Sequence, residues 1–105
     1  MKVIKTTWGI EILYRQADRY SCKKLIVLSG KEIGPQCDEE KEKIIICLDG
    51  YGWIQQDYKL IFTQSLAEGK VIHITPQCVY RIGASADNVL ELLEIEIAGL
   101  NDTLS

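Results

Sequence analysis

Short runs rich in valine, isoleucine and tyrosine recur along the whole chain, and turn signals separate each run from the next. Such β-branched and aromatic runs are typical of strands, and glycine, proline and asparagine mark the turns between them. The expected strands cover residues 10–14, 22–28, 43–49, 52–56, 59–63, 71–75, 78–82 and 89–97. Strands at such regular spacing predict an all-β sandwich or barrel.

The last of these runs alternates most regularly. Residues 93–97 read Leu-Glu-Ile-Glu-Ile, the pattern of a strand with one buried and one solvated face. A helix over 89–97 is the alternative, because leucine and glutamate are also good helix formers. The β-branched residues that close the run, and the strands elsewhere, favour a strand. A turn beginning at Gly99 is then expected to lead into a short tail over residues 98–105.

The size and composition of the chain are those of one globular domain. It has 105 residues, which is long enough to build a core without covalent cross-links. Of these residues, 47% are hydrophobic and 26% are charged, as in an ordinary globular protein. We expect a single domain over 1–105, with the barrel over about 2–97. The net charge of -3 argues against a nucleic-acid partner. Without an apolar run of membrane-spanning length or a signal peptide, we expect a cytoplasmic protein and no membrane partner.

Four cysteines raise the question of disulfides or a zinc site. No two of them form a Cys-X-X-Cys pair, and Cys47 lies in the apolar run 44–48, where a thiol behaves as a small hydrophobe. We expect free thiols in a reducing compartment, with a ligand cluster as the alternative.

The spacing of several glycines and polar residues resembles the cupin superfamily of small jelly-roll barrels. That superfamily has two motifs, G(X)5HXH(X)3-4E(X)6G and G(X)5PXG(X)2H(X)3N, and every interval of both is kept in this sequence. The first falls on Gly30, Gln36, Asp38, Lys43 and Gly50, and the second on Gly69, Thr75, Gln77, Tyr80 and Ala84. The resemblance implies a single-domain cupin barrel, also described as a double-stranded β-helix, with turns of positive φ at the three motif glycines.

A finer resemblance covers residues 7–97. Trp8-Gly9, the segment KLIVLSGKEI over 24–33 and Gln36 are similar to the small mannose-6-phosphate isomerase-like cupins. These in turn resemble the C-terminal domain of bifunctional mannose-6-phosphate isomerase/mannose-1-phosphate guanylyltransferases. The resemblance implies a sugar or sugar-phosphate ligand, although cupins host many unrelated activities.

The four metal-ligand positions of the motifs are substituted. Gln36, Asp38, Lys43 and Tyr80 stand where the family has His, His, Glu and His. A divalent metal prefers imidazoles and carboxylates, so Asp38 alone is a conventional ligand. The charge of Lys43 would repel a cation, and a phenol such as Tyr80, with a pKa of about 10, is rarely ionised. We therefore expect no bound metal and no cofactor.

The resemblance implies that these four positions face the lumen. There, Lys43 is expected to pair with Asp38, because a buried charge must be compensated. The Tyr80 hydroxyl and the Gln36 amide would complete a polar network. A lysine and a phenol facing an open pocket can hold a small polar or anionic ligand. The alternative is that the network only fills the lumen.

His73 is the fifth candidate for the ligand-binding site. It lies in the expected strand 71–75, on the same face as Val71 and Thr75, but alternation does not say which face is the lumen. A metal site rebuilt from His73 and nearby cysteines is an alternative to an ordinary histidine. Arg81 follows Tyr80 directly and is expected on the opposite face of its strand.

Three functions remain open. The first is a metal-free cupin that binds a small polar ligand. The second is a degenerate scaffold for dimerisation or partner binding. The third is a sugar or sugar-nucleotide isomerase or epimerase that uses Tyr80, Lys43 or His73 as acid and base, although no residue is assigned a catalytic role. We also expect a two-fold homodimer, in which the strand over 10–14 could extend a neighbour's sheet.

Overall fold

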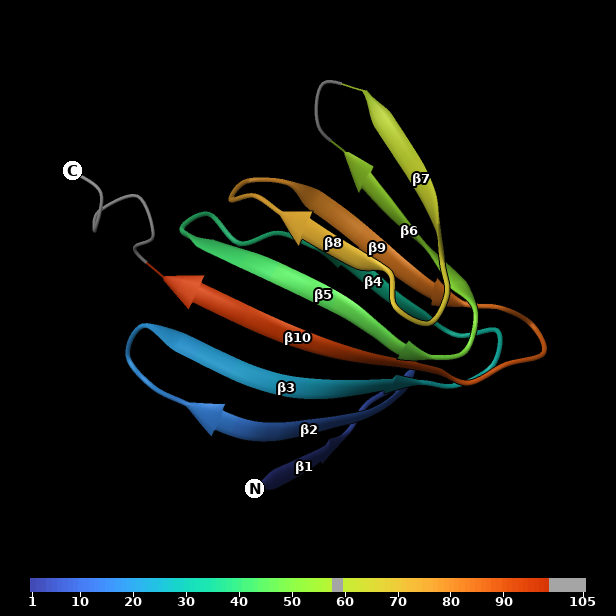
Figure 1. Cartoon of the computed structure of the whole chain (residues 1–105), viewed down its shortest axis with the longest axis horizontal. Helices are drawn as coiled ribbons and strands as arrows, with labels where there is room; N and C mark the ends of the chain where they lie inside the picture. The colour runs from blue at the N-terminus through green and yellow to red at the C-terminus, as the bar shows by residue number, and fades with distance from the viewer. Residues whose placement is uncertain (58–59, 99–105) are drawn as a thin grey trace.

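The computed structural model describes residues 1–57 and 60–98, and these residues form strands and turns without any helix. The expected all-β fold is confirmed. Within the described residues, ten strands follow one another (Figure 1): β1 (Lys2–Lys5), β2 (Gly9–Gln16), β3 (Tyr20–Val27), β4 (Glu32–Gln36), β5 (Lys41–Asp49), β6 (Gly52–Asp57), β7 (Ile61–Leu66), β8 (Val71–Ile74), β9 (Val79–Ala84) and β10 (Leu90–Ala98). Accordingly, no described helix could cross a membrane.

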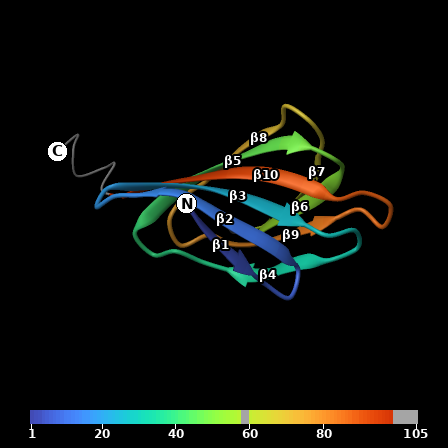
Figure 2. The same cartoon turned by 90° about the horizontal axis from the view of Figure 1, so that it is seen from below.

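The strands form two antiparallel sheets that face each other (Figure 2). The larger sheet has six strands in the order β1-β2-β3-β10-β5-β8, and the smaller has four in the order β4-β9-β6-β7. Strands far apart in sequence, such as β3 and β10, are neighbours, as a jelly roll requires. The sandwich arrangement gives each sheet an inner face toward the core and an outer face.

Each of the eight expected strands is present, with shifted ends. The strand expected over 59–63 is β7, and residue 59 lies outside the described residues, as does the turn expected from Gly99. The sequence reading missed β1 and β4. β4 contains Gly34 and Pro35, which read as turn residues, but proline is tolerated because β4 is the edge of its sheet. β1 is a short edge strand with lysine at both ends.

The expectation that the strand over 10–14 extends a neighbour's sheet is wrong. That segment belongs to β2, which pairs with β1 on one side and with β3 on the other. Over residues 10–13 both edges of β2 are paired within the sheet, so these residues leave no backbone edge for another chain.

The motif glycines adopt the expected turns. Gly30, Gly50 and Gly69 have φ values of 71°, 90° and 89°. Gln77 has a φ of 69° and is the only non-glycine residue with positive φ among the described residues. It occupies the glycine position of the second motif, so the turn geometry is kept although the glycine is not.

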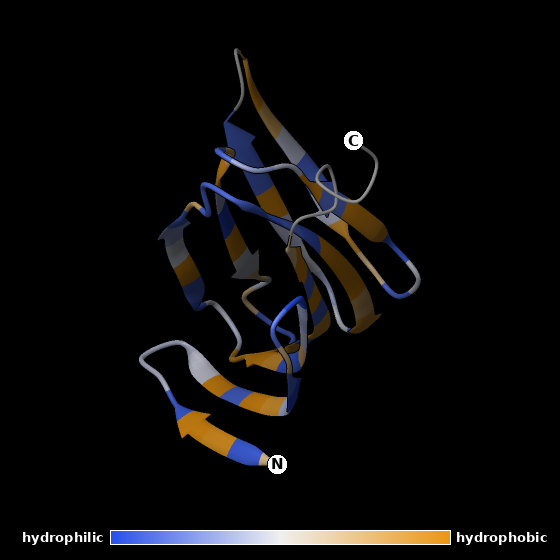
Figure 3. Ribbon diagram, turned by 90° about the vertical axis from the view of Figure 1, so that its left-hand side faces the viewer, coloured by the Kyte–Doolittle hydropathy of each residue, from blue (hydrophilic) through white to orange (hydrophobic). Residues whose placement is uncertain are grey.

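The hydrophobic core lies between the inner faces of the two sheets. Val27, Ile45, Ile54, Ile82 and Leu90 have no measurable exposure. Burying such side chains stabilises the fold by roughly 1.5–3 kcal/mol each. Apolar and polar residues alternate along most strands (Figure 3), which places one set inside and the other outside.

In β10 the alternation has an unexpected direction. The buried set is Leu90, Leu92 and Glu94, so the glutamates of the 93–97 run continue the inner face. Glu94 is only 2% exposed, whereas Leu93 and Ile95 lie on the outer face. The run therefore brings carboxylates, and not isoleucines, into the interior of the fold.

Candidate functional site

A cavity of about 240 Å³ lies between the two sheets, on the side where β2 and β3 approach β4 and β9. Its apolar lining is formed by Trp8, Leu25, Ile33 and Ile82, which come from both sheets and the loop before β2. Its polar lining is formed by Thr6, Glu11, Lys23, Gln36, Tyr80 and Glu94. A large aromatic ring and several polar groups around one cavity are the composition of a small-molecule site.

Trp8 is held at the cavity by the backbone around it. The N–H of Gly9 donates to Thr6 Oγ1 at 2.9 Å, and the N–H of Leu28 donates to the Trp8 carbonyl at 2.9 Å. Position 9 must be glycine, because a Cβ there would lie 1.9 Å from the Ile26 carbonyl oxygen. The Trp8-Gly9 pair thus anchors the entry into β2 and fixes the indole beside the site.

Lys43 lies at the centre of the polar groups and is 7% exposed. Its Nζ donates to the Tyr80 hydroxyl at 2.9 Å. The same atom lies 3.5 Å from Glu94 Oε1 and 3.3 Å from Glu96 Oε1. An ammonium ion surrounded by two carboxylates and a hydroxyl is a compensated buried charge.

The Tyr80 hydroxyl joins the two sheets. It accepts from Lys43, and its single proton can be donated to Gln36 Oε1 at 3.0 Å or to Glu94 Oε1 at 3.3 Å. Tyr80 and Gln36 face each other in the β9–β4 register, which explains their proximity. The two acceptors therefore compete for one donor.

Glu94 extends the network to the cavity wall. Its Oε2 lies 3.2 Å from Lys23 Nζ, and Lys23 also pairs with Glu11. The register places Glu94 opposite Lys23 in the pairing of β10 with β3. In the described part of the chain, every fully buried side-chain N or O atom has a hydrogen-bond partner. The network is satisfied by the chain itself.

The network keeps its lysines charged and its tyrosine neutral. Burial alone would lower the pKa of Lys43, but Glu94, Tyr80 and Glu96 outweigh it and raise the pKa well above its ordinary value. For Lys23, the carboxylates of Glu94 and Glu11 likewise outweigh burial and raise the pKa. Burial, helped by the charge of Glu94, raises the pKa of Tyr80 strongly. Lys23, Lys43 and Tyr80 therefore keep their protons near pH 7.

Three of the five expected ligand-binding residues lie together. Gln36, Lys43 and Tyr80 form one connected group, with Gln36 and Tyr80 on the cavity wall and Lys43 behind them. The sequence spacing thus located the polar centre, although Gln36 itself lies on an exposed edge strand.

The expected pairing of Lys43 with Asp38 is wrong. Asp38 Oδ1 accepts the backbone N–H groups of Glu40 and Lys41 at 2.9 and 2.8 Å. The slight burial of the Asp38 carboxyl opposes these two bonds but is outweighed, and its pKa is lowered. Asp38 shapes the turn before β5, because an aspartate bonds readily to the backbone two or three residues on.

His73 does not reach the cavity. Alternation in β8 turns its neighbours Ile72 and Ile74 inward, so the side chain of His73 is on the outer face and 56% exposed. Its Nε2 lies 3.0 Å from Glu42 Oε2. His73 is an ordinary surface residue of the larger sheet and does not belong to the candidate site.

Arg81 lies on the opposite face from Tyr80, as expected. It forms two hydrogen bonds of 3.1 Å with the carboxylate of Glu32 and packs over the ring of Trp53. Trp53 therefore belongs to the outer surface of the smaller sheet, in contrast to Trp8.

The residues at the four motif positions do not fit a divalent metal. The Lys43 ammonium occupies the region between the nearest carboxylates, and Asp38 is engaged in its turn. Among the described residues, no three His, Cys, Asp or Glu side chains are grouped as metal ligands. The four cysteines are free thiols, of which Cys47 and Cys78 are buried, Cys22 is half-buried and Cys37 is exposed.

Sequence reasoning missed the carboxylates of the site and Lys23. Glu94, Glu96 and Glu11 come from strands outside both motifs, so motif spacing could not indicate them. One signal was present: Leu90, Leu92 and Glu94 are two residues apart, and a strand places them on one face. A buried Leu92 would have required an inward Glu94.

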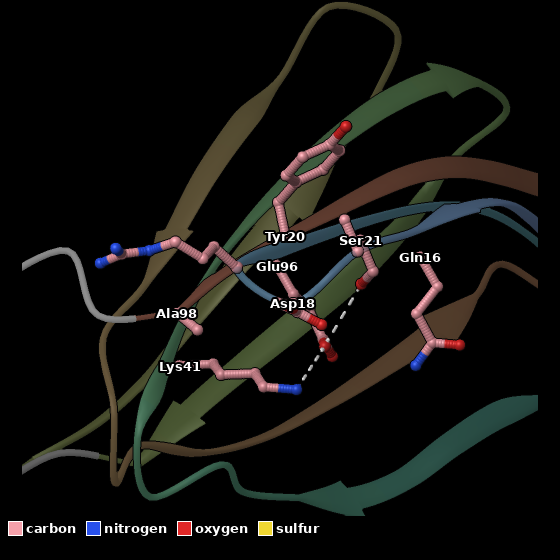
Figure 4. Close-up of a pocket in the computed structure, with 9 residues that line it drawn as sticks. Gln16, Asp18, Tyr20, Ser21, Lys41, Glu96 and Ala98 are labelled. Atoms are coloured by element: carbon pink, nitrogen blue, oxygen red, sulfur yellow. Dashed lines mark hydrogen bonds and ion pairs between the residues drawn. The ribbon is translucent and has the colours of Figure 1, made fainter.

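A second, smaller pocket lies where β2 turns into β3 (Figure 4). Ser21 Oγ donates to Glu96 Oε2 at 3.4 Å, and Lys41 Nζ lies 3.7 Å from the same atom. Its volume of about 20 Å³ holds roughly one water molecule. It is therefore too small for an organic ligand.

No protein-family model matches the sequence, and no curated protein matches it significantly. Solved structures match the fold. KdgF from Halomonas sp. has a TM-score of 0.80 at 10% identity, over 98% of this chain and 93% of that protein. A cupin domain from Schizosaccharomyces pombe has a TM-score of 0.78 at 9% identity, over 90% of this chain and 68% of that chain.

The capsular polysaccharide assembling protein CapF from Staphylococcus aureus is also similar. It has a TM-score of 0.83 at 14% identity, over 92% of this chain, which corresponds to only 28% of CapF. At such low identities these matches show the fold alone. The expected single-domain cupin jelly roll is thereby confirmed.

Proposed function

We propose that this chain is a metal-free cupin-fold protein that binds a small, neutral, polyhydroxy ligand of the sugar class in the 240 Å³ cavity. The observation that carries the proposal is the lining of that cavity. One indole and several hydrogen-bonding side chains converge on a space that the chain leaves open.

The size of the cavity favours a monosaccharide. Small-molecule sites usually measure about 300–1,000 Å³, and this one lies just below that range. The Trp8 ring can pack against the C–H face of a sugar, while carboxylates such as Glu11 accept hydrogen bonds from its hydroxyls. The amide of Gln36 both donates and accepts. A nucleotide or an oligosaccharide would not fit as a whole.

The charges of the cavity favour a neutral ligand over a sugar phosphate. The two lysines, Lys23 and Lys43, are already paired with carboxylates. An incoming phosphate would have to displace Glu94 and would meet the negative charge of Glu11 and Glu96. The sugar-phosphate ligand implied by the mannose-6-phosphate isomerase-like resemblance is therefore the less favoured form.

An isomerase or epimerase that uses Lys43, Tyr80 or His73 is disfavoured, because none of these three residues can act as a base in the cavity. Lys43 and Tyr80 hold their protons far above neutral pH, since the pKa of each is raised. His73 faces away from the cavity. A packed scaffold is disfavoured by the open volume itself.

The proposal is tested by titrating the protein with neutral monosaccharides and with their phosphate esters, using calorimetry and tryptophan fluorescence. A neutral sugar should bind, and its phosphate should bind at least tenfold more weakly. Trp8→Ala should abolish binding, whereas Trp53→Phe, on the outer surface, should leave it unchanged. Preferred binding of the phosphate, or binding that survives Trp8→Ala, would contradict the proposal.

A further inference from the structure

One ion pair of the larger sheet forms part of the wall of the cavity. Glu11 from β2 and Lys23 from β3 both line it. Glu11 lies opposite Leu25 in the strand register, which makes Lys23 its diagonal neighbour on the inner face. Lys23 Nζ lies 2.5 Å from Glu11 Oε1, and the two side chains are 23% and 20% exposed. A positive and a negative group therefore lie side by side at the cavity.

Lys23 is held in place from its other side. Glu94 Oε2 lies 3.2 Å from Lys23 Nζ, and the Glu94 side chain is 3% exposed. The two carboxylates outweigh burial and raise the pKa of Lys23, so its ammonium group stays charged. The other lysine of the network, Lys43, does not line the cavity. Among the described residues that line it, Lys23 is thus the only cation.

The pair has hydrogen-bonding capacity that the described part of the chain does not use. An ammonium group has three N–H donors, and Lys23 Nζ has two acceptors within reach, on Glu11 and Glu94. A carboxylate has two oxygens, and only Glu11 Oε1 has a side-chain partner among the described residues. One donor of Lys23 and one oxygen of Glu11 are therefore left for a molecule that enters the cavity.

The unused donor and the unused acceptor point in different directions. The three N–H bonds of an ammonium group diverge tetrahedrally, so the unused bond of Lys23 points away from both carboxylates. A single hydroxyl reaches Glu11 Oε2 only by leaving the line of that N–H bond, and a hydrogen bond weakens as it bends. Two neighbouring hydroxyls can meet the two groups separately, each along a nearly straight bond. Both bonds are then charge-assisted and stronger than bonds between neutral groups.

We propose that Glu11 and Lys23 select ligands that carry two adjacent free hydroxyl groups. One hydroxyl donates to Glu11 Oε2, and the oxygen of its neighbour accepts from Lys23 Nζ. This inference rests on the proposed sugar ligand and adds the feature by which the site distinguishes one sugar from another, a vicinal diol. A sugar that lacks either hydroxyl leaves one charged group of the pair without that hydrogen bond.

Calorimetric titration of the wild-type chain with glucose, mannose and galactose, and then with the monodeoxy analogues of the tightest binder, tests the proposal. Loss of either hydroxyl of the diol should raise the dissociation constant by at least about tenfold, because a charged group loses a hydrogen bond. The two largest losses of affinity should fall on adjacent carbon atoms of the sugar ring.

Two variants assign the hydroxyls to the two residues. In Glu11→Met the penalty for losing one hydroxyl should fall below about threefold, and in Lys23→Met the same should hold for the other hydroxyl. A general loss of stability would not remove the penalty for one particular hydroxyl. Glu91→Met is the matched control and should keep both penalties. Glu91 pairs with Lys24 at 3.7 Å between β10 and β3, but neither residue lines the cavity.

The results separate this selection from the sugar site itself. If none of the three sugars binds, the proposed function and this inference both fail. If a sugar binds but its monodeoxy series is uniform, has one sensitive position or has two that are not adjacent, the sugar site stands and the diol selection is overturned. The wild-type series decides this even where a variant does not fold. Penalties that survive in both Glu11→Met and Lys23→Met would overturn the assignment to these two residues.

Discussion

Lys43 carries its charge at a position that is 7% exposed, and three oxygen atoms within 3.5 Å compensate that charge. In a site of this kind the contribution of one residue to stability depends on the other residues of the network. A buried pair with all its hydrogen bonds contributes little net stability, but removing one member leaves an uncompensated charge. The polar centre of this protein should therefore respond sharply to single substitutions.

Lys43→Met is expected to lower the free energy of unfolding by about 3–5 kcal/mol, since Glu94 and Glu96 would lose their shared cation. Lys41→Met is the control. Lys41 is 43% exposed and 3.7 Å from Glu96, so its loss should cost less than about 1 kcal/mol. Denaturant unfolding followed by tryptophan fluorescence measures both. Equal costs for the two variants would show that Lys43 is not the centre of the network.

The raised pKa values of Lys43 and Tyr80 make the fold sensitive to alkali. Their ordinary pKa values are 10.5 and 10.0, and the folded values are higher, so their contribution is complete below about pH 10. It is lost as the pH rises above these ordinary values, because the unfolded chain then releases protons that the folded chain retains.

Tyr80→Phe should make this alkaline loss of stability shallower, since one of the responsible groups is gone. Tyr51→Phe, at a tyrosine that is 61% exposed, serves as the control and should leave the slope unchanged. Unfolding free energies measured between pH 8 and about pH 11 decide the matter. An unaltered slope in Tyr80→Phe would refute the assignment of the effect to this network.

At the scale of elements, the turn between β8 and β9 joins the two sheets next to the site. Gln77, in this turn, has a φ of 69° and donates its N–H to the Asp38 carbonyl at 2.7 Å. A residue with a Cβ in this region of φ costs roughly 1–2 kcal/mol relative to its preferred conformation. The turn is therefore held against a local preference by the strands around it.

Gln77→Val should lower the free energy of unfolding by about 1–2 kcal/mol, because a β-branched side chain tolerates this φ least. The free energy of unfolding of Gln77→Gly should lie within about 1 kcal/mol of the wild-type value, since glycine removes the strain but increases the entropy of the unfolded chain. Thermal and denaturant unfolding compare the two. A valine variant as stable as the glycine variant would show that φ at this position carries no cost.

The fold was largely predictable from local patterns, because strand runs and glycine turns act over a few residues. The strands that were not predicted, β1 and β4, are exceptions to those patterns. β4 was not predicted because Pro35 is typical of a turn. Proline is tolerated in this strand only because β4 lies at the edge of its sheet. Asp38 was misassigned because its contacts with the backbone of Glu40 and Lys41 outweigh a distant pairing.

The candidate site was only half predictable. Spacing within the motifs located Gln36, Lys43 and Tyr80, but their carboxylate partners depend on which strand pairs with β10. Pairing between distant strands is a property of the whole fold, and no local pattern in the sequence contains it. The direction of the β10 alternation likewise follows from packing and not from hydrophobicity.

At the scale of the whole molecule, two sheets enclose a network that the chain completes with its own charges. Gln36 and Tyr80 come from the smaller sheet, and Lys43 and Glu94 from the larger one, so the network crosses the interior. A lysine ammonium supplies the positive charge at the centre. The central claim is that this network, and not a bound metal ion, maintains the site.

The melting temperature of the purified protein with and without a strong chelator tests this claim most directly. Since no metal-binding free energy is available to be lost, the two melting curves should coincide, and elemental analysis should find well under one equivalent of zinc, manganese, iron or nickel. A melting temperature that falls on chelation, together with a stoichiometric metal, would contradict the account.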